Sequence, residues 1–332
     1  MTEILTIAGP SAEHLDWVAR LYGQADPKYR DPAFLEHLFV HNPVGPSLHT
    51  FAVDAGTPVG HSCIVRTQAR WGSDDLAAGK VEAIWLESSH RGRRLGGEAL
   101  ARVLLSKLWT LADDQGVELL HALATPRIGR VIRFTPLAPV GARTLVSVVS
   151  AEGRGIAGRA LALTQRLARE ATAAPVGRAT LRAVVHDDAD LVEVGRLPPD
   201  RWAIAGDAAW GWYCSSPLLR VLELAGCRAL VQLPASPHEP LRLVGWRAER
   251  PRLRTALRVL AAAGRLAREH GATSLRFQPS PGPAGDGNLR RACLVSGFVP
   301  RGDLTTVWVR ATRTELVRAE AMVSTPFLYL GF

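Results

Sequence analysis

The sequence predicts an α/β fold that is present twice, as two tandem domains that each hold a mixed central sheet flanked by helices. Three observations predict it. Residues 81–116 have the pattern of a strand, a basic glycine loop and an amphipathic helix. Short apolar runs and helix-periodic segments alternate along the rest of the chain. Gly116 recurs as Gly271, 155 positions later, each following a predicted helix and preceding a predicted strand.

The first half begins with a short predicted strand at residues 4–7 and a helix that Ser11 caps. A second helix is expected over 31–43. Strands over 50–54 and 57–67 are separated by an Ala-Gly turn. They lead into the strand at 81–86.

Residues 81–116 carry the most specific pattern. Val81 to Leu86 is apolar apart from Glu82, as expected for a strand buried on both faces. The segment RGRRLGG at 91–97, called the glycine loop below, follows it. We expect Glu98 in the first turn of the next helix, where a carboxylate suits the positive end of the dipole. Gly116 is placed to end that helix.

After Gly116 the sequence predicts a strand at 118–124. Residues 1–150 are then one domain, 151–176 a helical linker and 177–332 a second domain.

A glycine loop between a strand and a helix N-terminus suits an anion, because backbone N–H groups can approach it and the helix dipole favours its charge. Arg91, Arg93 and Arg94 add guanidinium groups that bind phosphate oxygens. The loop has neither the GK[ST] of a Walker motif nor a GxGxxG dinucleotide fingerprint.

The loop resembles the acyl-CoA loop of the GNAT (GCN5-related) N-acetyltransferases. That pattern is Gln or Arg, two residues, Gly, one residue, then Gly or Ala, between a strand and a helix. Arg91 and Gly96 match its two ends, while Arg94 replaces the middle glycine. The predicted element order β-α-α-β-β-β-α-β is also that of the family.

The resemblance implies acetyl-CoA as co-substrate and no metal. It implies that the strands at 81–86 and 118–124 splay apart around the pantetheine arm. The cofactor-binding residues that it implies are Leu86, Glu87, Ser88, Arg91, Gly92, Arg93, Arg94, Leu95, Gly96 and Gly97.

The reaction implied is acyl transfer from acetyl-CoA to a primary amine of a small molecule or sugar, and the enzyme an N-acetyltransferase. Glu82 is the candidate catalytic base, because it is the one acid in its strand; pairing with a nearby arginine is the alternative role. His121 is a second option for the base, against a role as a satisfied core histidine. Glu87 is placed to buffer the arginines of the glycine loop. The resemblance implies that residues 125–134 are the last helix of the domain, but they lack the tyrosine that protonates the leaving thiolate in the family.

The second half departs from the first where the loop should be. At the offset of 155, Arg91 aligns with Trp246 and Gly96 with Pro251, which has no N–H to donate. This half is therefore predicted to be a degenerate GNAT-like domain. A helix at 288–296 and a strand at 305–309 are expected to end it.

Composition narrows the kinds of partner and the cellular location that the protein can have. The formal net charge is +9. Of the 40 basic residues, only Lys28, Lys80 and Lys107 are lysines, and the others are arginines spread along the chain. Because the arginines are spread in this way, we expect no nucleic-acid partner. No apolar run reaches membrane-spanning length and no signal peptide is recognised, so we expect a cytoplasmic protein without a membrane partner. The four scattered cysteines form no CxxC motif. His37 and His41 lie four apart on one predicted helix face, but no third metal ligand accompanies them, so a polar face is the favoured interpretation.

Two alternatives stay open. One is an inactive CoA-binding or regulatory tandem module, which the Arg94 departure and the missing tyrosine favour. The other is an aminoacyl-tRNA-dependent transferase of the same double architecture, which the positive charge favours.

Overall fold

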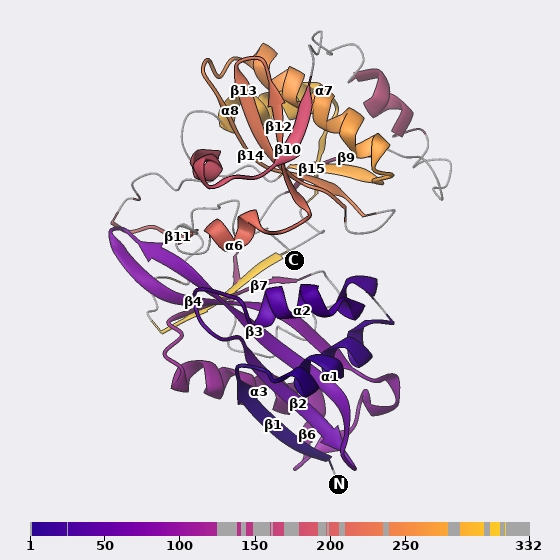
Figure 1. Cartoon of the computed structure of the whole chain (residues 1–332), viewed down its shortest axis with the longest axis vertical. Helices are drawn as coiled ribbons and strands as arrows, with labels where there is room; N and C mark the ends of the chain where they lie inside the picture. Colours follow the sequence, from indigo (N-terminus) through magenta and orange to yellow (C-terminus); the bar gives the residue numbers. More distant parts are fainter. Residues whose placement is uncertain are drawn as a thin grey trace. The chain divides into compact units, whose positions relative to one another are not determined.

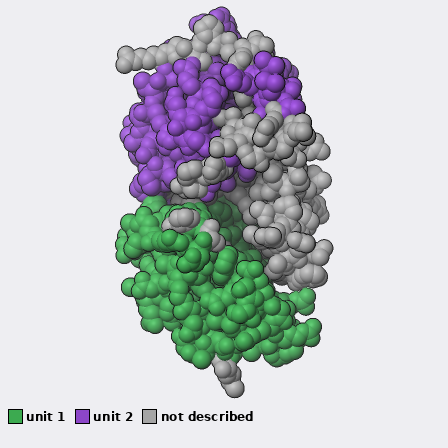
Figure 2. All heavy atoms as spheres, turned by 90° about the vertical axis from the view of Figure 1, so that its right-hand side faces the viewer, with its two compact units in different colours: residues 1–141, 197–204, 305–322 green, residues 142–196, 205–304, 323–332 purple. Residues whose placement is uncertain are grey.

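The computed structural model describes residues 2–24, 26–124, 138–140, 144–148, 160, 162–168, 179–191, 197, 199–205, 210–234, 239–277, 286–301, 306–312 and 316. The chain divides into two compact units (Figure 2). Unit 1 comprises residues 1–141, 197–204 and 305–322, and unit 2 comprises residues 142–196, 205–304 and 323–332. Neither unit is continuous in sequence, and the boundaries given by the ranges 1–150, 151–176 and 177–332 stay a prediction.

Unit 1 is built, within the described residues, on an eight-stranded sheet with the order β1-β2-β3-β4-β7-β17-β8, and β11 pairs with β3 (Figure 1). Its strands are β1 (Thr2–Ala8), β2 (Leu48–Asp54), β3 (Thr57–Trp71), β4 (Asp74–Leu86), β7 (Leu119–Ala124), β8 (Ala138–Val140), β11 (Trp202–Ala205) and β17 (Thr306–Ala311).

Helices cover both faces of this sheet. They are α1 (Ala12–Tyr22), α2 (Pro32–Phe39) and α3 (Leu100–Asp114), with short 3-10 turns η1 (Pro27–Arg30) and η2 (Ser88–His90). His61 meets Tyr22 of α1, whereas Thr50 donates to the carbonyl of Leu104 in α3. His61 pairs with Phe51, so the two side chains point to the same face of the sheet. Thr50 precedes Phe51 on β2 and therefore points to the opposite face. The helices α1 and α3 thus lie on opposite faces of the sheet.

Two sequence features account for the start and the anchoring of these helices. Ser11 caps α1, and its backbone N–H donates to His14 Nδ1 at 3.1 Å. The apolar side of α3 packs with Ile64 and Val81 in one buried cluster. The predicted element order β-α-α-β-β-β-α-β is confirmed. Among the described residues, no helix is both long and apolar enough to cross a membrane.

The prediction that Glu98 lies in the first helical turn is wrong. Residues Arg94–Leu95 (β5) and Glu98–Ala99 (β6) form a two-stranded hairpin, and α3 begins only at Leu100. Gly96 and Gly97 between them have φ of 58° and 88°. Two successive positive φ angles close the tight turn that joins hairpin strands, and glycine adopts them without strain.

Unit 2 has, within the described residues, a seven-stranded sheet with the order β10-β12-β13-β14-β15-β9-β16. Its strands are β9 (Thr144–Val148), β10 (Thr180–Ala183), β12 (Leu219–Leu224), β13 (Cys227–Gln232), β14 (Leu241–Ala248), β15 (Ser274–Phe277) and β16 (Val299–Arg301). Its helices include η3 (His186–Leu191), α6 (Trp210–Cys214), α7 (Leu253–Glu269) and α8 (Asp286–Val295), and residues 162–168 are also helical.

The repeat is visible where α3 and α7 end. Gly116 and Gly271 have φ of 68° and 66°. The next residue in each case, Val117 or Ala272, donates its N–H back to Ala112 O or Ala267 O, at 2.9 and 2.8 Å. The two helices therefore end in the same way, as the offset of 155 predicts.

The same offset fails upstream of these helices. Trp246 lies inside β14, opposite Ala229, whereas Arg91 follows the end of β4. The alignment of Arg91 with Trp246 is therefore wrong. Residues 249–252 join β14 to α7, against 87–99 between β4 and α3, so the second half lacks the whole loop.

The two sheets exchange one strand each. β17 was expected to end the second half, but it lies in the sheet of unit 1 between β7 and β8, where Val309 faces His121 in the register. Conversely, β9 of the first half lies between β15 and β16 in the sheet of unit 2. The strand at 305–309 is thus correctly predicted as a strand and wrongly assigned to its sheet.

Candidate functional site

β4 and β7 part in the middle of unit 1. Their parallel pairing runs from Ala78 beside Leu119 to Val81 beside Ala122. Beyond Val81, β4 continues to Leu86 and pairs, among the described residues, with β3 alone. The edge of β4 that faced β7 is therefore released over its last residues.

Glu82 occupies the point where the two strands part. Cys63 pairs with Ala83 and Ile64 with Val81, so Glu82 is the extra residue of a bulge in β4. Its carboxylate Oε2 lies 2.7 Å from Lys80 Nζ, and the two side chains are 9% and 7% exposed. The partner is thus a lysine rather than the arginine considered from the sequence.

His121 lies across from Lys80 in the parallel register of β4 and β7. Its ring is fully buried, and neither nitrogen has a hydrogen-bond partner among the described residues. Burial, followed by the charge of Lys80, lowers the pKa of His121 to about 3. The imidazole is therefore neutral near pH 7. The predicted helix at 125–134 lies outside the described residues.

Two buried tyrosines belong to the same electrostatic neighbourhood. Tyr22 and Tyr29 stack with ring centroids 5.0 Å apart, and Tyr22 also lies 5.6 Å from the Trp85 ring. Burial raises the pKa of both phenols, and nearby groups that include Cys63 and Glu82 raise it further. The spacing of these two tyrosines along the chain does not reveal that both lie within electrostatic range of Glu82.

A chain of buried polar groups lies on the same side of the sheet. Burial lowers the pKa of His49 to about 3, and burial also lowers the pKa of His61 well below its usual value. His49 Nδ1 lies 2.9 Å from His61 Nε2, and His61 Nδ1 lies 3.1 Å from the Tyr22 hydroxyl. Both imidazoles are therefore neutral at pH 7 and joined by hydrogen bonds.

The glycine loop is exposed and its backbone is folded by glycine. Gly92 has φ of 88°, and no atom lies within 4 Å of an added side chain at Gly92, Gly96 or Gly97. Arg93 N donates to His90 O and Leu100 N to Arg93 O, which holds the hairpin against the start of α3. The space outside these glycines is open.

The three arginines of the loop differ in their partners. Arg91 Nε donates to Leu86 O at 3.1 Å, and its guanidinium lies 5.6 Å from the Trp85 ring centroid. Arg93 Nη1 donates to Asp54 at 3.1 Å. The Arg94 side chain is exposed and has no hydrogen-bond or ion-pair partner among the described residues. It is the arginine with its charge available to a ligand.

Glu87 does not neutralise the arginines of the glycine loop, contrary to what the sequence led us to expect. Its carboxylate lies 3.7 Å from Arg20 of α1 rather than beside a loop arginine. Asp54 pairs with Arg93 instead. A hydrogen bond to His90, with help from Thr2 and Arg93, lowers the pKa of Asp54 to about 2.

The backbone at the end of β4 offers fewer groups than the sequence suggested. Glu87 N donates to Val59 O at 2.9 Å, so this N–H points toward β3. Because successive strand residues point their backbone groups to opposite edges, those of Leu86 face the released edge. Leu86 O is already taken by Arg91, which leaves Leu86 N–H as the donor toward the opening.

Comparison with known proteins identifies the architecture. The sequence matches no protein-family model and no curated protein. Solved structures match over nearly the whole chain. A tandem GNAT protein from the clavulanic acid biosynthesis pathway has a TM-score of 0.54 at 14% identity, covering 94% of this chain and 98% of that one. A GCN5-related N-acetyltransferase from Kribbella flavida has a TM-score of 0.53 at 14% identity, covering 93% and 71%.

A third match is the N-myristoyltransferase of Saccharomyces cerevisiae with bound myristoyl-CoA, with a TM-score of 0.56 at 11% identity, covering 94% and 79%. Identities this low establish the fold and leave the chemistry to the site. The chain has the fold of the GCN5-related N-acetyltransferases, in its tandem form.

Proposed function

We propose that this protein is an acyl-CoA-dependent N-acyltransferase that moves an acetyl group from acetyl-CoA to a primary amine of a small molecule or sugar. One observation carries the proposal. In unit 1, β4 parts from β7 at Glu82 and then leads through the glycine loop to the N-terminus of α3. Unit 2 has only residues 249–252 at the corresponding place.

The residues around the loop fit a CoA ester. Arg94 offers a guanidinium without a partner among the described residues, and Gly96 and Gly97 leave open space against which phosphate oxygens can rest. The N-terminus of α3 adds the positive end of a helix dipole. Arg91 and Arg93 would contribute charge while staying bound to Leu86 O and Asp54. The remaining proposed contacts are Leu86, Glu87, Ser88, Gly92 and Leu95.

The chemistry follows from the groups at the end of β4. CoA supplies an acyl group activated as a thioester. The acceptor must attack as a neutral amine, and Glu82 is the carboxylate that would take its proton, directly or through one water. The N–H of Leu86 points to the released edge, where it would stabilise the oxygen that becomes negative during attack. The thiolate would depart toward the arginines of the loop.

A second candidate function has one observation in its favour. Glu82 is engaged by Lys80 at 2.7 Å, so its carboxylate is not freely available. A tandem module that binds CoA without turnover would also show this arrangement. The aminoacyl-tRNA-dependent alternative draws support only from the overall positive charge.

The test is calorimetric titration of acetyl-CoA into the wild type, Gly96→Asp and Gly96→Asn. Aspartate and asparagine are both tolerated at positive φ, so the pair differs mainly in charge at φ of 58°. We expect the wild type to bind, Gly96→Asn to weaken binding modestly, and Gly96→Asp to abolish binding by repelling phosphate. Release of free CoA with a panel of amines then distinguishes the enzyme from the inactive module.

Equal binding by all three proteins would place the ligand elsewhere. Failure of the wild type to bind would reject the acyl-CoA proposal. Binding without CoA release from any amine would favour the regulatory module.

A further inference from the structure

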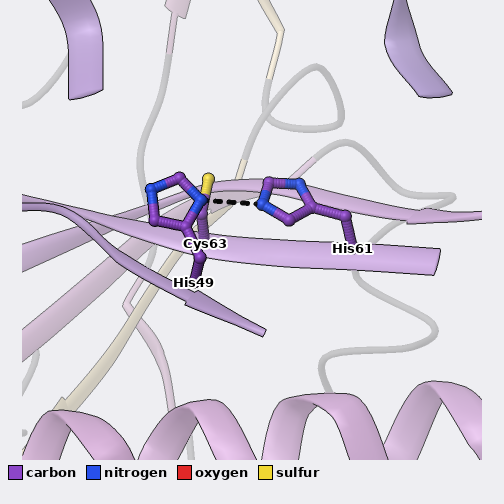
Figure 3. A group of neighbouring side chains, drawn as sticks. All are labelled: His49, His61 and Cys63. Atoms are coloured by element: carbon purple, nitrogen blue, oxygen red, sulfur yellow. Dashed lines mark hydrogen bonds between the residues drawn. The ribbon is translucent and has the colours of Figure 1, made fainter. Parts of the chain in front are cut away.

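Three side chains with metal-binding atoms meet on one face of the sheet of unit 1 (Figure 3). His49 of β2 and Cys63 of β3 are direct cross-strand partners, and His61 precedes Cys63 by two residues. Strand alternation therefore brings all three to the same face. Each is 0% exposed. The imidazole and thiol ligand atoms all lie within 4.8 Å of one another.

The outward nitrogen of His49 is held by the hydroxyl group of Ser47. Ser47 Oγ donates to Phe39 O at 2.8 Å and lies 2.7 Å from His49 Nε2. Since the serine hydroxyl donates its proton to Phe39 O, its oxygen accepts a hydrogen bond from His49 Nε2–H. The lone pair of His49 Nδ1 then points into the cluster. A histidine whose second nitrogen is fixed in this way has the tautomer that a metal ligand needs.

The outward nitrogen of His61 is held by Tyr22. The tyrosine hydroxyl lies 3.2 Å from His61 O and 3.1 Å from His61 Nδ1. When the O–H donates to the carbonyl, its oxygen accepts from Nδ1–H, and the His61 Nε2 lone pair also points inward. When the O–H donates to Nδ1, a proton on Nε2 bridges the two rings instead. Binding of a cation would require that proton to move to Nδ1, with the tyrosine O–H turning to the His61 carbonyl, so that the imidazole stays neutral.

The donor set selects the kind of cation. Two imidazoles and one thiol are soft or borderline ligands, and no carboxylate joins them among the described residues, which disfavours Mg²⁺ and Ca²⁺. Zinc or copper bonds of about 2.0–2.3 Å place ligand atoms about 3.5 Å apart, so the ring nitrogens, now 2.9 Å apart, would separate slightly. In a fully buried site the charge should cancel, and Cu⁺ with one thiolate is neutral overall.

We propose that His49, His61 and Cys63 form a buried three-ligand site for a soft, thiophilic cation, and that Cu⁺ fits its charge best. The proposal departs from the expectation of no metal, because the spacing of these three residues along the chain matches no metal motif. The site lies on the α1 side of β2 and β3 and does not depend on the acyltransferase proposal. Its role would be to tie β2 to β3 beneath α1.

The experiment measures metal content in the full chain. Because the site is buried, a cation would enter during folding. The protein is unfolded with a chelator and refolded under reducing conditions with Cu⁺, Zn²⁺, Mg²⁺ or no metal. It is then desalted and analysed by elemental mass spectrometry. We expect one equivalent of Cu⁺ or Zn²⁺ retained by the wild type, no Mg²⁺, and a thiolate-to-metal absorption band with Cu⁺.

Two cysteine variants test whether Cys63 in particular binds the metal. Cys63→Ser should lose the equivalent and the band, whereas Cys293→Ser, at an equally buried cysteine of α8, should keep both. Circular dichroism checks that each variant folds, and Cys63→Ala replaces the serine variant if it does not. The reconstituted wild type should also melt at a higher temperature than the metal-free protein.

Two results would overturn the proposal. One is a refolded wild type that retains no soft cation. The other is a folded Cys63 variant that retains as much as the wild type. In either case the cluster is a closed hydrogen-bond chain and nothing more.

Discussion

The carboxylate of Glu82 lies 2.7 Å from the ammonium group of Lys80, two positions earlier on the same strand. Both side chains are almost fully buried. Breaking such a pair by removing one partner is far more costly than replacing both partners, because one buried charge loses its counter-charge. This relationship affects every experiment on the proposed base.

The first prediction concerns Glu82→Gln. We expect acyl transfer to fall by about 10²–10⁴-fold while acetyl-CoA affinity stays the same, because the amide cannot take the proton of the amine. We also expect the free energy of unfolding to fall by about 3–5 kcal/mol. Steady-state kinetics, calorimetry and denaturant unfolding measure the three quantities.

The double variant Lys80→Met/Glu82→Leu separates the two effects. Replacing a buried pair by apolar residues of similar volume often leaves stability unchanged. The double variant should therefore regain stability and stay inactive. A Glu82→Gln protein with the wild-type rate would remove Glu82 from the mechanism.

The second prediction concerns pH and Asp54. Its pKa is lowered to about 2, first by the hydrogen bond to His90, so the folded state favours the carboxylate. The resulting stability is present above the unfolded pKa of about 4 and is lost as the pH falls toward 2. The unfolding free energies of the wild type and Asp54→Asn should differ near pH 6 and converge between pH 4 and 2.

Denaturant titrations at several pH values test this prediction. Hydrogen exchange of residues 88–97 should also be faster in Asp54→Asn, because Arg93 loses its 3.1 Å partner. A stability difference that stays constant down to pH 2 contradicts the assignment.

The third prediction concerns Asp188 in unit 2. Its buried carboxylate accepts from Arg182 at 2.6 and 2.7 Å and from Arg228 at 2.8 Å. Burial acts to raise the pKa of Asp188, but these hydrogen bonds and charges lower it overall. Asp188→Asn should destabilise unit 2 by about 3–5 kcal/mol, measured by hydrogen exchange of β12 and β13.

Glu223→Gln provides the matched control. Glu223 binds the same Arg182 at 2.7 Å, but its side chain is 39% exposed. Its loss should cost less than about 1 kcal/mol, since exposed pairs are screened. Equal losses in the two variants would mean that burial of Asp188 is not the deciding factor.

The fourth prediction concerns the exchanged strand. A fragment of residues 1–150 lacks β17, which leaves the edge of β7 unpaired and open to association with other chains. We expect this fragment to aggregate. Joining residues 301–316 to it through a flexible linker should give a soluble protein in which the amides of Leu119–Ala124 are protected from exchange.

The same fusion carrying Val309→Asp is its control. Val309 is fully buried opposite His121, so an aspartate there should prevent docking of the strand. A soluble, protected 1–150 fragment without the added strand would show that β17 is dispensable for unit 1.

Local signals in the sequence predicted the local structure well. The Ser11 cap marks the start of α1, and Gly116 and Gly271 mark the ends of α3 and α7, because each depends on residues within one or two turns. The position of Glu98 was missed for a local reason as well. Two adjacent glycines form a hairpin turn as readily as they open a helix.

What the sequence could not supply is the partner of each element. A strand pattern at 305–309 is the same whether the strand joins β7 or β15, because the choice depends on long-range pairing. The meeting of His49 with His61 and Cys63 has the same origin. Their spacing along the chain matches no metal motif, and only the register of β2 with β3 brings them together.

The exchange of β9 and β17 also makes the two halves of the chain depend on each other. Deleting either half of the gene would remove a strand from the sheet that the other half encodes. Neither half therefore completes its own sheet, and the second half is structurally necessary to the sheet that carries the glycine loop.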